Sequence, residues 1–310
     1  MKEIQTLSQR VLANVQKVIL GKHQEVRLVL VALFAEGHLL LEDVPGVGKT
    51  MLSRAVARSL NCSHARLQCT PDLLPADLLG MTIYNQKTMD FEFRPGPVFH
   101  QVLLADEINR ATPKTQSALL ECMDEHQVTT DGVARALPRP FLVMATQNPI
   151  EYEGTFPLPE AQLDRFLLRV RLGYPSLEVE AEMLAVQQLR HPIEDLEPVV
   201  TSEELLRMQA KVHTVRVEES LRHYIVRLVQ ATRQTDRLFL GASPRGSQAL
   251  FRASQALAAM EGRDYVLPDD IKTLAIPALS HRMISRTDGV GGAAATDVLR
   301  EVLERIPVPV

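Results

Sequence analysis

The residues with the clearest chemical potential form a nonapeptide, Glu-Asp-Val-Pro-Gly-Val-Gly-Lys-Thr, at positions 42–50. It directly follows a short apolar run at 38–41, which indicates a buried strand. Glycines in a turn that leaves such a strand let backbone N–H groups approach a polyphosphate closely. Lys49 can then reach the β- and γ-phosphates, and Thr50 can offer its hydroxyl to Mg²⁺. The segment predicts a phosphate-binding cradle.

We expect nine consecutive residues of this segment to bind the nucleotide. They are Asp43, Val44, Pro45, Gly46, Val47, Gly48, Lys49, Thr50 and Met51. One of them departs from the general P-loop pattern, because that pattern has glycine where this chain has Asp43. The residues that face phosphate come later in the motif, so nucleotide binding is expected to survive the change.

Two carboxylates, Asp106 and Glu107, directly follow the apolar run 102–105. Four apolar residues indicate a strand in the sheet interior, and doubly wound sheets bind ligands at the C-terminal edge of their strands. Asp106 is expected to hold Mg²⁺ through its water shell, because Mg²⁺ prefers hard oxygen ligands and retains waters. Glu107 is expected to accept the proton of the attacking water.

A polar sensor and a further cation are expected to complete such a site. Asn148 lies at the end of the strand that the apolar run 141–145 indicates, and it can contact the γ-phosphate or orient the water, provided that this strand lies between those of the cradle and Asp106. Arg165 is the candidate arginine finger, placed to enter a neighbouring subunit's site, and Arg110 is a rival for that role. The alternative for Arg165 is a local ion pair with Asp164 or Glu160.

A second arginine of interest opens a helix in the C-terminal half. Ser243 suits the N-cap and Pro244 the first helical position, so Arg245 falls in the first turn and points back toward the first domain. There it can report the nucleotide state by moving a lid onto the γ-phosphate. The alternative is a solvent-exposed first-turn arginine.

The elements that must position these residues follow from the spacing of apolar runs. Five runs alternate with helical segments and indicate a five-stranded parallel sheet with helices on both faces. The runs are 38–41, 65–68, 102–105, 141–145 and 166–170. Two crossovers contain predicted hairpins, 81–84 with 91–93 and 127–130 with 133–136, the second around the turn Asp131-Gly132. An amphipathic helix is predicted over 3–19.

The chain changes character after residue 172, where only helical periodicity remains. We expect a nucleotide-binding α/β domain at 1–172, a linker with the first lid helix at 173–195, and a small all-α lid domain at 196–310. The length of 310 residues is sufficient for two domains with separate cores.

Composition limits the functions that this chain could have. The net charge is −4 and the basic residues are scattered, so nucleic acid is not an expected partner. The N-terminus lacks the apolar core of a signal peptide, and no apolar run is long enough to span a membrane. The three cysteines lack metal-ligand spacing and are expected to be reduced thiols. These features favour a cytoplasmic protein.

Four segments together resemble a MoxR-type AAA+ ATPase: 42–50, Leu-Leu-Ala-Asp-Glu-Ile-Asn-Arg-Ala at 103–111, Ala-Thr-Gln-Asn-Pro at 145–149, and Glu-Gly-Thr-Phe-Pro-Leu-Pro-Glu-Ala-Gln-Leu-Asp-Arg-Phe at 153–166. The resemblance implies a P-loop AAA+ domain with two hairpin insertions and a helical lid. It implies Mg²⁺-dependent ATP hydrolysis, with Glu107, Asn148, Arg165 and Arg245 as catalytic or sensing residues and Thr50 and Asp106 at the metal.

The same resemblance implies how the protein works with others. Members form homo-oligomeric rings, commonly hexamers, and act as chaperone-like ATPases that mature or activate partner complexes, often with a von Willebrand factor A domain protein encoded nearby. Two alternatives share the ATPase parts, a magnesium-chelatase-type motor subunit and a nucleic-acid translocase. The predicted hairpins argue against the latter, because Lys87 and Arg94 are balanced by Asp90 and Glu92 in the first, and Arg135 by Asp131 in the second.

Overall fold

The computed structural model describes residues 1–148, 154–186, 192–287, 289–290 and 292–309. Pro149 and Glu153 of the sequence motifs, and residues 187–191 of the predicted linker, lie outside the described residues. Within the described part of the chain, no helix has both the length and the apolar character to cross a membrane.

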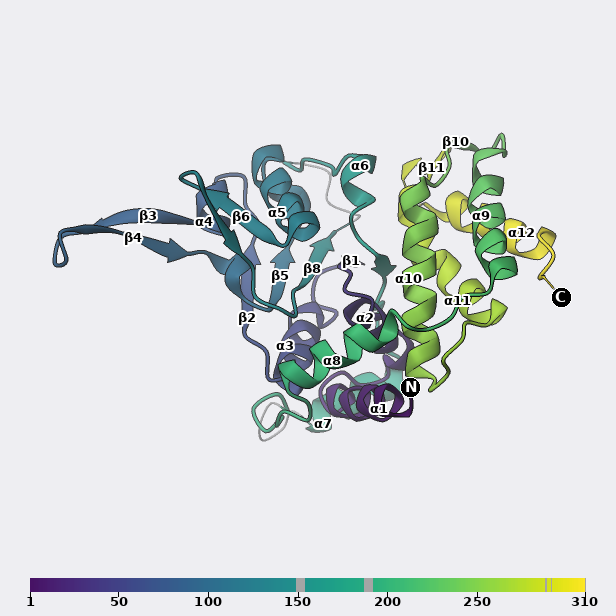
Figure 1. Cartoon of the computed structure of the whole chain (residues 1–310), viewed down its shortest axis with the longest axis horizontal. Helices are drawn as coiled ribbons and strands as arrows, with labels where there is room; N and C mark the ends of the chain where they lie inside the picture. The colour runs from purple at the N-terminus through teal and green to yellow at the C-terminus, as the bar shows by residue number, and fades with distance from the viewer. Residues whose placement is uncertain (149–153, 187–191, 288, 291, 310) are drawn as a thin grey trace.

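A five-stranded parallel sheet lies at the centre of the first domain, as predicted (Figure 1). Its order is β2-β5-β8-β1-β9, so β8 lies between the cradle strand β1 and the carboxylate strand β5. The strands are β1 (Leu39–Glu42), β2 (His64–Gln68), β5 (Val102–Asp106), β8 (Leu142–Gln147) and β9 (Leu168–Val170).

Successive side chains of these strands point to opposite faces of the sheet, and helices cover both faces. Leu39 and Leu41 of β1 pack into one apolar cluster together with helices α1, α2 and α3, whereas Leu40 packs into another with α4 and α5. Successive side chains of a strand point to opposite faces, so a continuous apolar run can serve two cores. The helices are α1 (Lys2–Gln16), α2 (His23–Phe34), α3 (Lys49–Ser59), α4 (Pro75–Leu79), α5 (Pro113–Glu125) and α6 (Glu160–Leu163), with short 3₁₀ turns η1 (Pro97–Phe99) and η2 (Ile108–Arg110).

Both predicted hairpins are present. β3 (Gly80–Asn85) pairs with β4 (Asp90–Pro95), and β6 (Gln127–Thr130) pairs with β7 (Val133–Ala136). The first extends far from the body of the molecule (Figure 1). The turn of the second is Asp131-Gly132, and both residues have positive φ, as a two-residue hairpin turn requires.

The two hairpins also contact each other. The guanidinium of Arg135 on β7 lies 3.9 Å from the ring centroid of Phe93 on β4. The Thr82 hydroxyl on β3 donates a hydrogen bond of 2.5 Å to Asp131 in the second turn. Together these contacts join the hairpins into one projecting unit.

The C-terminal half is mainly helical but contains one element that the sequence did not indicate. Strands β10 (Leu238–Leu240), β11 (Ile284–Ser285) and β12 (Gly289–Val290) form a small three-stranded sheet. Strands this short show no period of their own. The pairing of β10 with β11 also joins segments that are distant in the sequence. The helices are α7 (Leu177–Val186), α8 (Ser202–Val212), α9 (Glu219–Arg233), α10 (Pro244–Met260), α11 (Pro268–Leu279) and α12 (Ala293–Arg305), with a 3₁₀ turn η3 (Ser280–Arg282).

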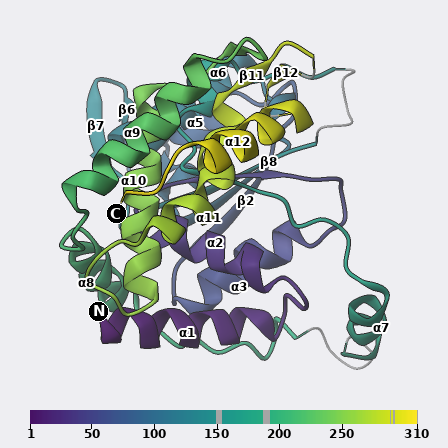
Figure 2. The same cartoon turned by 90° about the vertical axis from the view of Figure 1, so that its right-hand side faces the viewer.

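The lid packs closely on the first domain, with α10 and α11 between that domain and the outer helices α9 and α12 (Figures 1 and 2). One apolar cluster continues from α1 and α2 into α10 and α11, so the first domain and the lid share part of their core. Polar contacts reinforce this interface, because Arg282 donates to the Asp164 carboxylate at 2.6 Å and His281 hydrogen-bonds the Phe166 carbonyl at 2.9 Å.

Candidate active site

The cradle forms at the turn between β1 and α3. Gly46 and Gly48 have φ of +85° and +94°, a region that favours glycine, and Gly48 caps the N-terminus of α3. Apart from the glycine itself and its two chain neighbours, no described atom lies within 4 Å of the point where a Cβ would stand on either glycine. Free backbone N–H groups at a helix start, facing open space, suit an anion such as phosphate.

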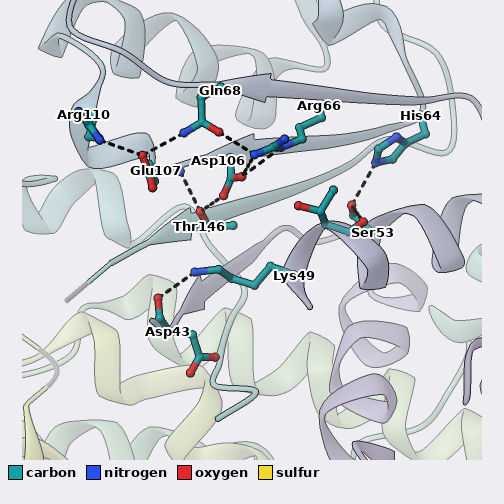
Figure 3. A network of polar contacts seen from close by, with 11 residues as sticks. Asp43, Lys49, Ser53, His64, Arg66, Gln68, Asp106, Glu107, Arg110 and Thr146 are labelled. Carbon is teal, nitrogen blue, oxygen red and sulfur yellow. Dashed lines mark hydrogen bonds and ion pairs between the residues drawn. The ribbon is translucent and has the colours of Figure 1, made fainter. Parts of the chain in front are cut away.

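Lys49 lies at the base of this cradle. Its side chain is largely buried, and its ammonium donates a hydrogen bond of 2.8 Å to the backbone carbonyl of Asp43 (Figure 3). Burial lowers the pKa of the Lys49 ammonium, while the charges of Asp106, Asp43 and Glu107 raise it. A bound phosphate would add negative charge and favour the charged form further.

The carboxylates of Asp106 and Glu107 reach the same pocket from β5. Glu107 adopts a left-handed conformation, with φ of +57°, which is unusual for a residue with a side chain and typical of functional turns. Thr146 of β8 connects the pair, because its hydroxyl donates to Asp106 at 2.6 Å and accepts from the backbone N–H of Glu107 at 2.8 Å. The neighbouring strand thus holds both carboxylates in place (Figure 3).

Strand β2 contributes two residues that the sequence did not single out. Arg66 donates to the Asp106 carboxylate through Nε at 3.1 Å and Nη2 at 2.7 Å. Gln68 donates to Glu107 at 2.9 Å, and Arg110 of η2 lies 3.3 Å from the same oxygen. The sequence does show alternate polar residues near the end of β2. Their role could not be predicted from this pattern, because it depends on the pairing of β2 with β5.

These groups surround a pocket of about 340 Å³. Its lining comprises Pro45, Gly46, Gly48, Lys49, Thr50, Met51, Arg66, Gln68, Asp106, Glu107 and Asn148. Six of the nine predicted cradle residues are therefore present. The other three, Asp43, Val44 and Val47, are not among the described residues that line the pocket. For Asp43 the reason is clear, because its carboxylate is directed at the backbone of Leu172 and Gly173.

The pocket also fits a divalent metal held together with a nucleotide. Within the described residues, no group of three or more His, Cys, Asp or Glu side chains could hold a metal alone. Mg²⁺ in phosphate-binding sites needs only one or two protein oxygens, because phosphates and waters supply the rest. Thr50 and Asp106, both in the lining, provide such oxygens.

The two remaining arginines lie elsewhere. Neither Arg165 nor Arg245 is among the described residues that line the cradle pocket. Both contact Asp124 of α5, at 3.3 and 3.5 Å, within a second cleft of about 820 Å³ between the first domain and the lid. The alternative for Arg165, a local ion pair with Asp164 or Glu160, is not found among the described residues, because Arg165 pairs with Asp124 and Asp164 binds Arg282 and Ser243.

Comparisons with known proteins agree with this arrangement. Residues 38–168 match the ATPase family associated with various cellular activities (AAA), and residues 230–302 match the AAA lid domain. The chain is 42% identical to the chaperone MoxR1 of Mycobacterium tuberculosis, over 99% of this chain and 83% of that protein. It is 52% identical to the uncharacterized protein YeaC of Bacillus subtilis, over 100% and 97%. A crystal structure of a candidate ATPase from Cytophaga hutchinsonii superposes with a TM-score of 0.92 at 38% identity, covering 100% of this chain and 97% of that one.

Fold, pocket and lid together define a nucleotide-binding P-loop ATPase of the AAA+ class. Within that class, the chain belongs to the MoxR family.

Proposed function

We propose that this chain is an Mg²⁺-dependent ATPase that hydrolyses ATP at the subunit interfaces of a homo-oligomeric ring, most commonly a hexamer. Through this hydrolysis the ring remodels or activates a partner protein complex. One observation supports the interface most directly. The cradle and the arginines Arg165 and Arg245 face different pockets of the same subunit. A site that needs both is complete only when one subunit meets another.

Within one subunit, each residue of the cradle pocket has a proposed task. Lys49 binds the β- and γ-phosphates. Thr50 and Asp106 would hold Mg²⁺, which would neutralise charge on the phosphate oxygens. Glu107 accepts the proton of the attacking water once its contacts with Gln68 and Arg110 are exchanged. Asn148, at the end of the strand between β5 and β1, orients that water or contacts the γ-phosphate.

The neighbouring subunit supplies the remaining positive charge. Arg165 acts as the finger, and Arg245 senses the nucleotide from the same cleft. Asp124 pairs with both arginines and holds them side by side until a phosphate takes its place. Arg110 is the weaker candidate for a finger, because it contacts Glu107 of its own subunit.

A subunit-mixing experiment tests the interface. Arg165→Ala and Lys49→Ala proteins should each be inactive alone. In a mixture, the first supplies intact cradles and the second intact arginines. At equal mixing and random assembly, about a quarter of the interfaces pair the two, so a corresponding fraction of turnover should return. Arg300→Ala, at an exposed position on α12, serves as the control and should retain full activity. No recovery at any ratio would contradict the shared site.

The projecting hairpins are the proposed contact with the partner. Exposed apolar side chains lie along the first one, with Met89 and Phe91 about 70% exposed and Tyr84 packed against Phe91. Such a surface suits a protein chain better than a phosphate backbone. A von Willebrand factor A domain protein is a specific candidate partner, and a cytoplasmic location remains a prediction. A strongly salt-dependent affinity for DNA would favour translocation along nucleic acid instead.

A further inference from the structure

Asp43, which replaces the usual glycine of the P-loop, has a buried carboxylate with a defined set of partners. Only 8% of the residue is exposed. One carboxylate oxygen accepts the backbone N–H of Leu172, and the other accepts that of Gly173 at 3.0 Å. Two backbone donors on one buried carboxylate form a charge-assisted pair of hydrogen bonds, so the residue is a specific anchor.

The anchored segment is the point at which the chain leaves the first domain. Leu172 and Gly173 follow β9, and Gly173 has φ of +63° at the start of the path toward α7 and the lid. The preceding residue Glu42 strengthens the same junction, because its carboxylate accepts from Arg169 at 3.1 Å and from Arg171 at 2.9 Å.

Arg169 extends this connection into the lid. Its guanidinium is buried and donates to the Ser280 hydroxyl of η3 at 2.8 Å. Burial lowers the pKa of the Arg169 guanidinium, and the charge of Glu42, its ion-pair partner, opposes that shift. The first two residues of the P-loop segment therefore reach both the linker and the lid.

The backbone of Asp43 is connected to the nucleotide site through Lys49, because the Asp43 carbonyl oxygen accepts the hydrogen bond from the Lys49 ammonium (Figure 3). A phosphate bound in the cradle competes for that ammonium. We propose that Asp43 is a positioning residue that transmits occupation of the cradle to the linker at 172–173 and onward to the lid. This inference rests on the proposed function only in taking the ligand to be a nucleotide.

Asp43→Asn is the sharpest variant, because it keeps the size but replaces one acceptor oxygen with an amide that faces a backbone N–H. The chain has no tryptophan, so Tyr174→Trp, at an exposed position beside Gly173, gives a single fluorescent reporter. Three properties of the Tyr174→Trp protein are then measured. Calorimetry gives the ATP affinity, and phosphate release gives the turnover. Tryptophan emission at saturating ADP or ATP reports the response of the linker.

The reporter protein should change its emission when nucleotide saturates the site. With Asp43→Asn, ATP affinity should stay within about threefold of the parent, whereas the emission change should disappear. Turnover should fall about tenfold in kcat with little change in KM, the size expected for losing one charge-assisted hydrogen bond. Asp72→Asn, at an exposed turn, is the matched control and should leave all three measurements unchanged.

An unchanged emission response in Asp43→Asn would overturn the proposal, as would a loss of ATP binding in proportion to the loss of turnover. If Asp43→Asn does not fold, the Gly173→Ala variant tests the same connection between the cradle and the linker. That alanine meets no neighbour within 4 Å but disfavours the left-handed backbone that presents the amide to Asp43. It should weaken the emission response at unchanged ATP affinity, and an unaltered response would overturn the proposal. Binding and emission do not depend on hydrolysis, so failure of the proposed ATPase activity remains distinguishable.

Discussion

Glu107 is restrained in this structure by the hydrogen bond from Gln68, the ion pair with Arg110 and a left-handed backbone. A general base must be free to reach its proton. We therefore expect that these contacts keep Glu107 from acting until nucleotide and neighbour are both in place. Asp106 is also held, by hydrogen bonds from Thr146 and Arg66, but the role that we propose for it does not require it to move.

Glu107→Gln should separate binding from turnover. The amide can retain a hydrogen bond within the site but cannot accept the water proton, so turnover should fall by about 10²-fold or more while ATP affinity persists. Equilibrium binding and phosphate release measure the two effects. Glu121→Gln on the exposed side of α5 is the control and should behave as wild type. Undiminished phosphate release would remove Glu107 from the role of base.

Residue types and spacing predicted the cradle, both carboxylates and the position of Asn148, because each directly follows an apolar strand. Thr146, Arg66 and Gln68 were not predicted to act, since their roles depend on which strands are neighbours. Asp124 was also missed. Its importance comes from two arginines that are distant in sequence and meet only after the lid packs on the first domain.

At the level of elements, the projecting hairpin depends on a tight junction at its base. The backbones of Gly80 and Gly96 approach each other so closely that a Cβ on Gly96 would lie 2.2 Å from the Leu78 carbonyl oxygen and 2.5 Å from the Gly80 nitrogen. Backbone atoms cannot move aside as a flexible side chain can. Both glycines are therefore required by the close approach of two chain segments.

Gly96→Ala should loosen the hairpin at its base, with a cost of about 1–3 kcal/mol from the clash. Hydrogen exchange of residues 80–95 should accelerate, while the cradle should retain nucleotide affinity. Gly132→Ala in the turn of the second hairpin meets no neighbour within 4 Å and should cost about 1 kcal/mol or less. Equal exchange rates in the Gly96→Ala and wild-type hairpins would show that the junction tolerates a side chain.

Elements with strong local signals were predicted best. The Asp131-Gly132 turn and the five apolar runs specify hairpin and strands from neighbouring residues alone. The three short strands of the lid were not foreseen, because two or three residues carry no period and the pairing of β10 with β11 joins segments more than forty residues apart. The core shared by the first domain and the lid was not foreseen for a similar reason, since nothing local predicts that α10 packs on α1 and α2.

For the whole molecule, Arg282 is central to the association of lid and first domain. Its side chain is about 1% exposed and donates to the Asp164 carboxylate, the Asp164 carbonyl and the Phe166 carbonyl. Asp164 also accepts from Ser243, the N-cap of α10, at 2.6 Å. Because Arg165 follows Asp164 and Arg245 follows Ser243, this cluster fixes the spacing of the two arginines that we assign to the neighbour's nucleotide.

Arg282→Ala should destabilise the protein by about 3–5 kcal/mol, because it leaves buried acceptors without their partner. Urea unfolding should show a lower midpoint, and the lid and first domain should no longer unfold together. Arg300→Ala removes an exposed pair with Asp297 and should change stability by at most about 0.5 kcal/mol. A wild-type midpoint for Arg282→Ala would mean that the apolar interface alone holds the lid.

The strand order has a consequence for how the protein is made. β1, which carries the cradle, pairs on one side with β8 and on the other with β9, strands that the ribosome produces much later than residues 39–42. Strand β8 is complete only when translation has passed residue 147, and β9 only when it has passed residue 170. Long-range pairing of this kind slows folding. ATP binding should therefore be acquired late in synthesis, and a nascent chain interrupted between β8 and β9 should expose one edge of β1.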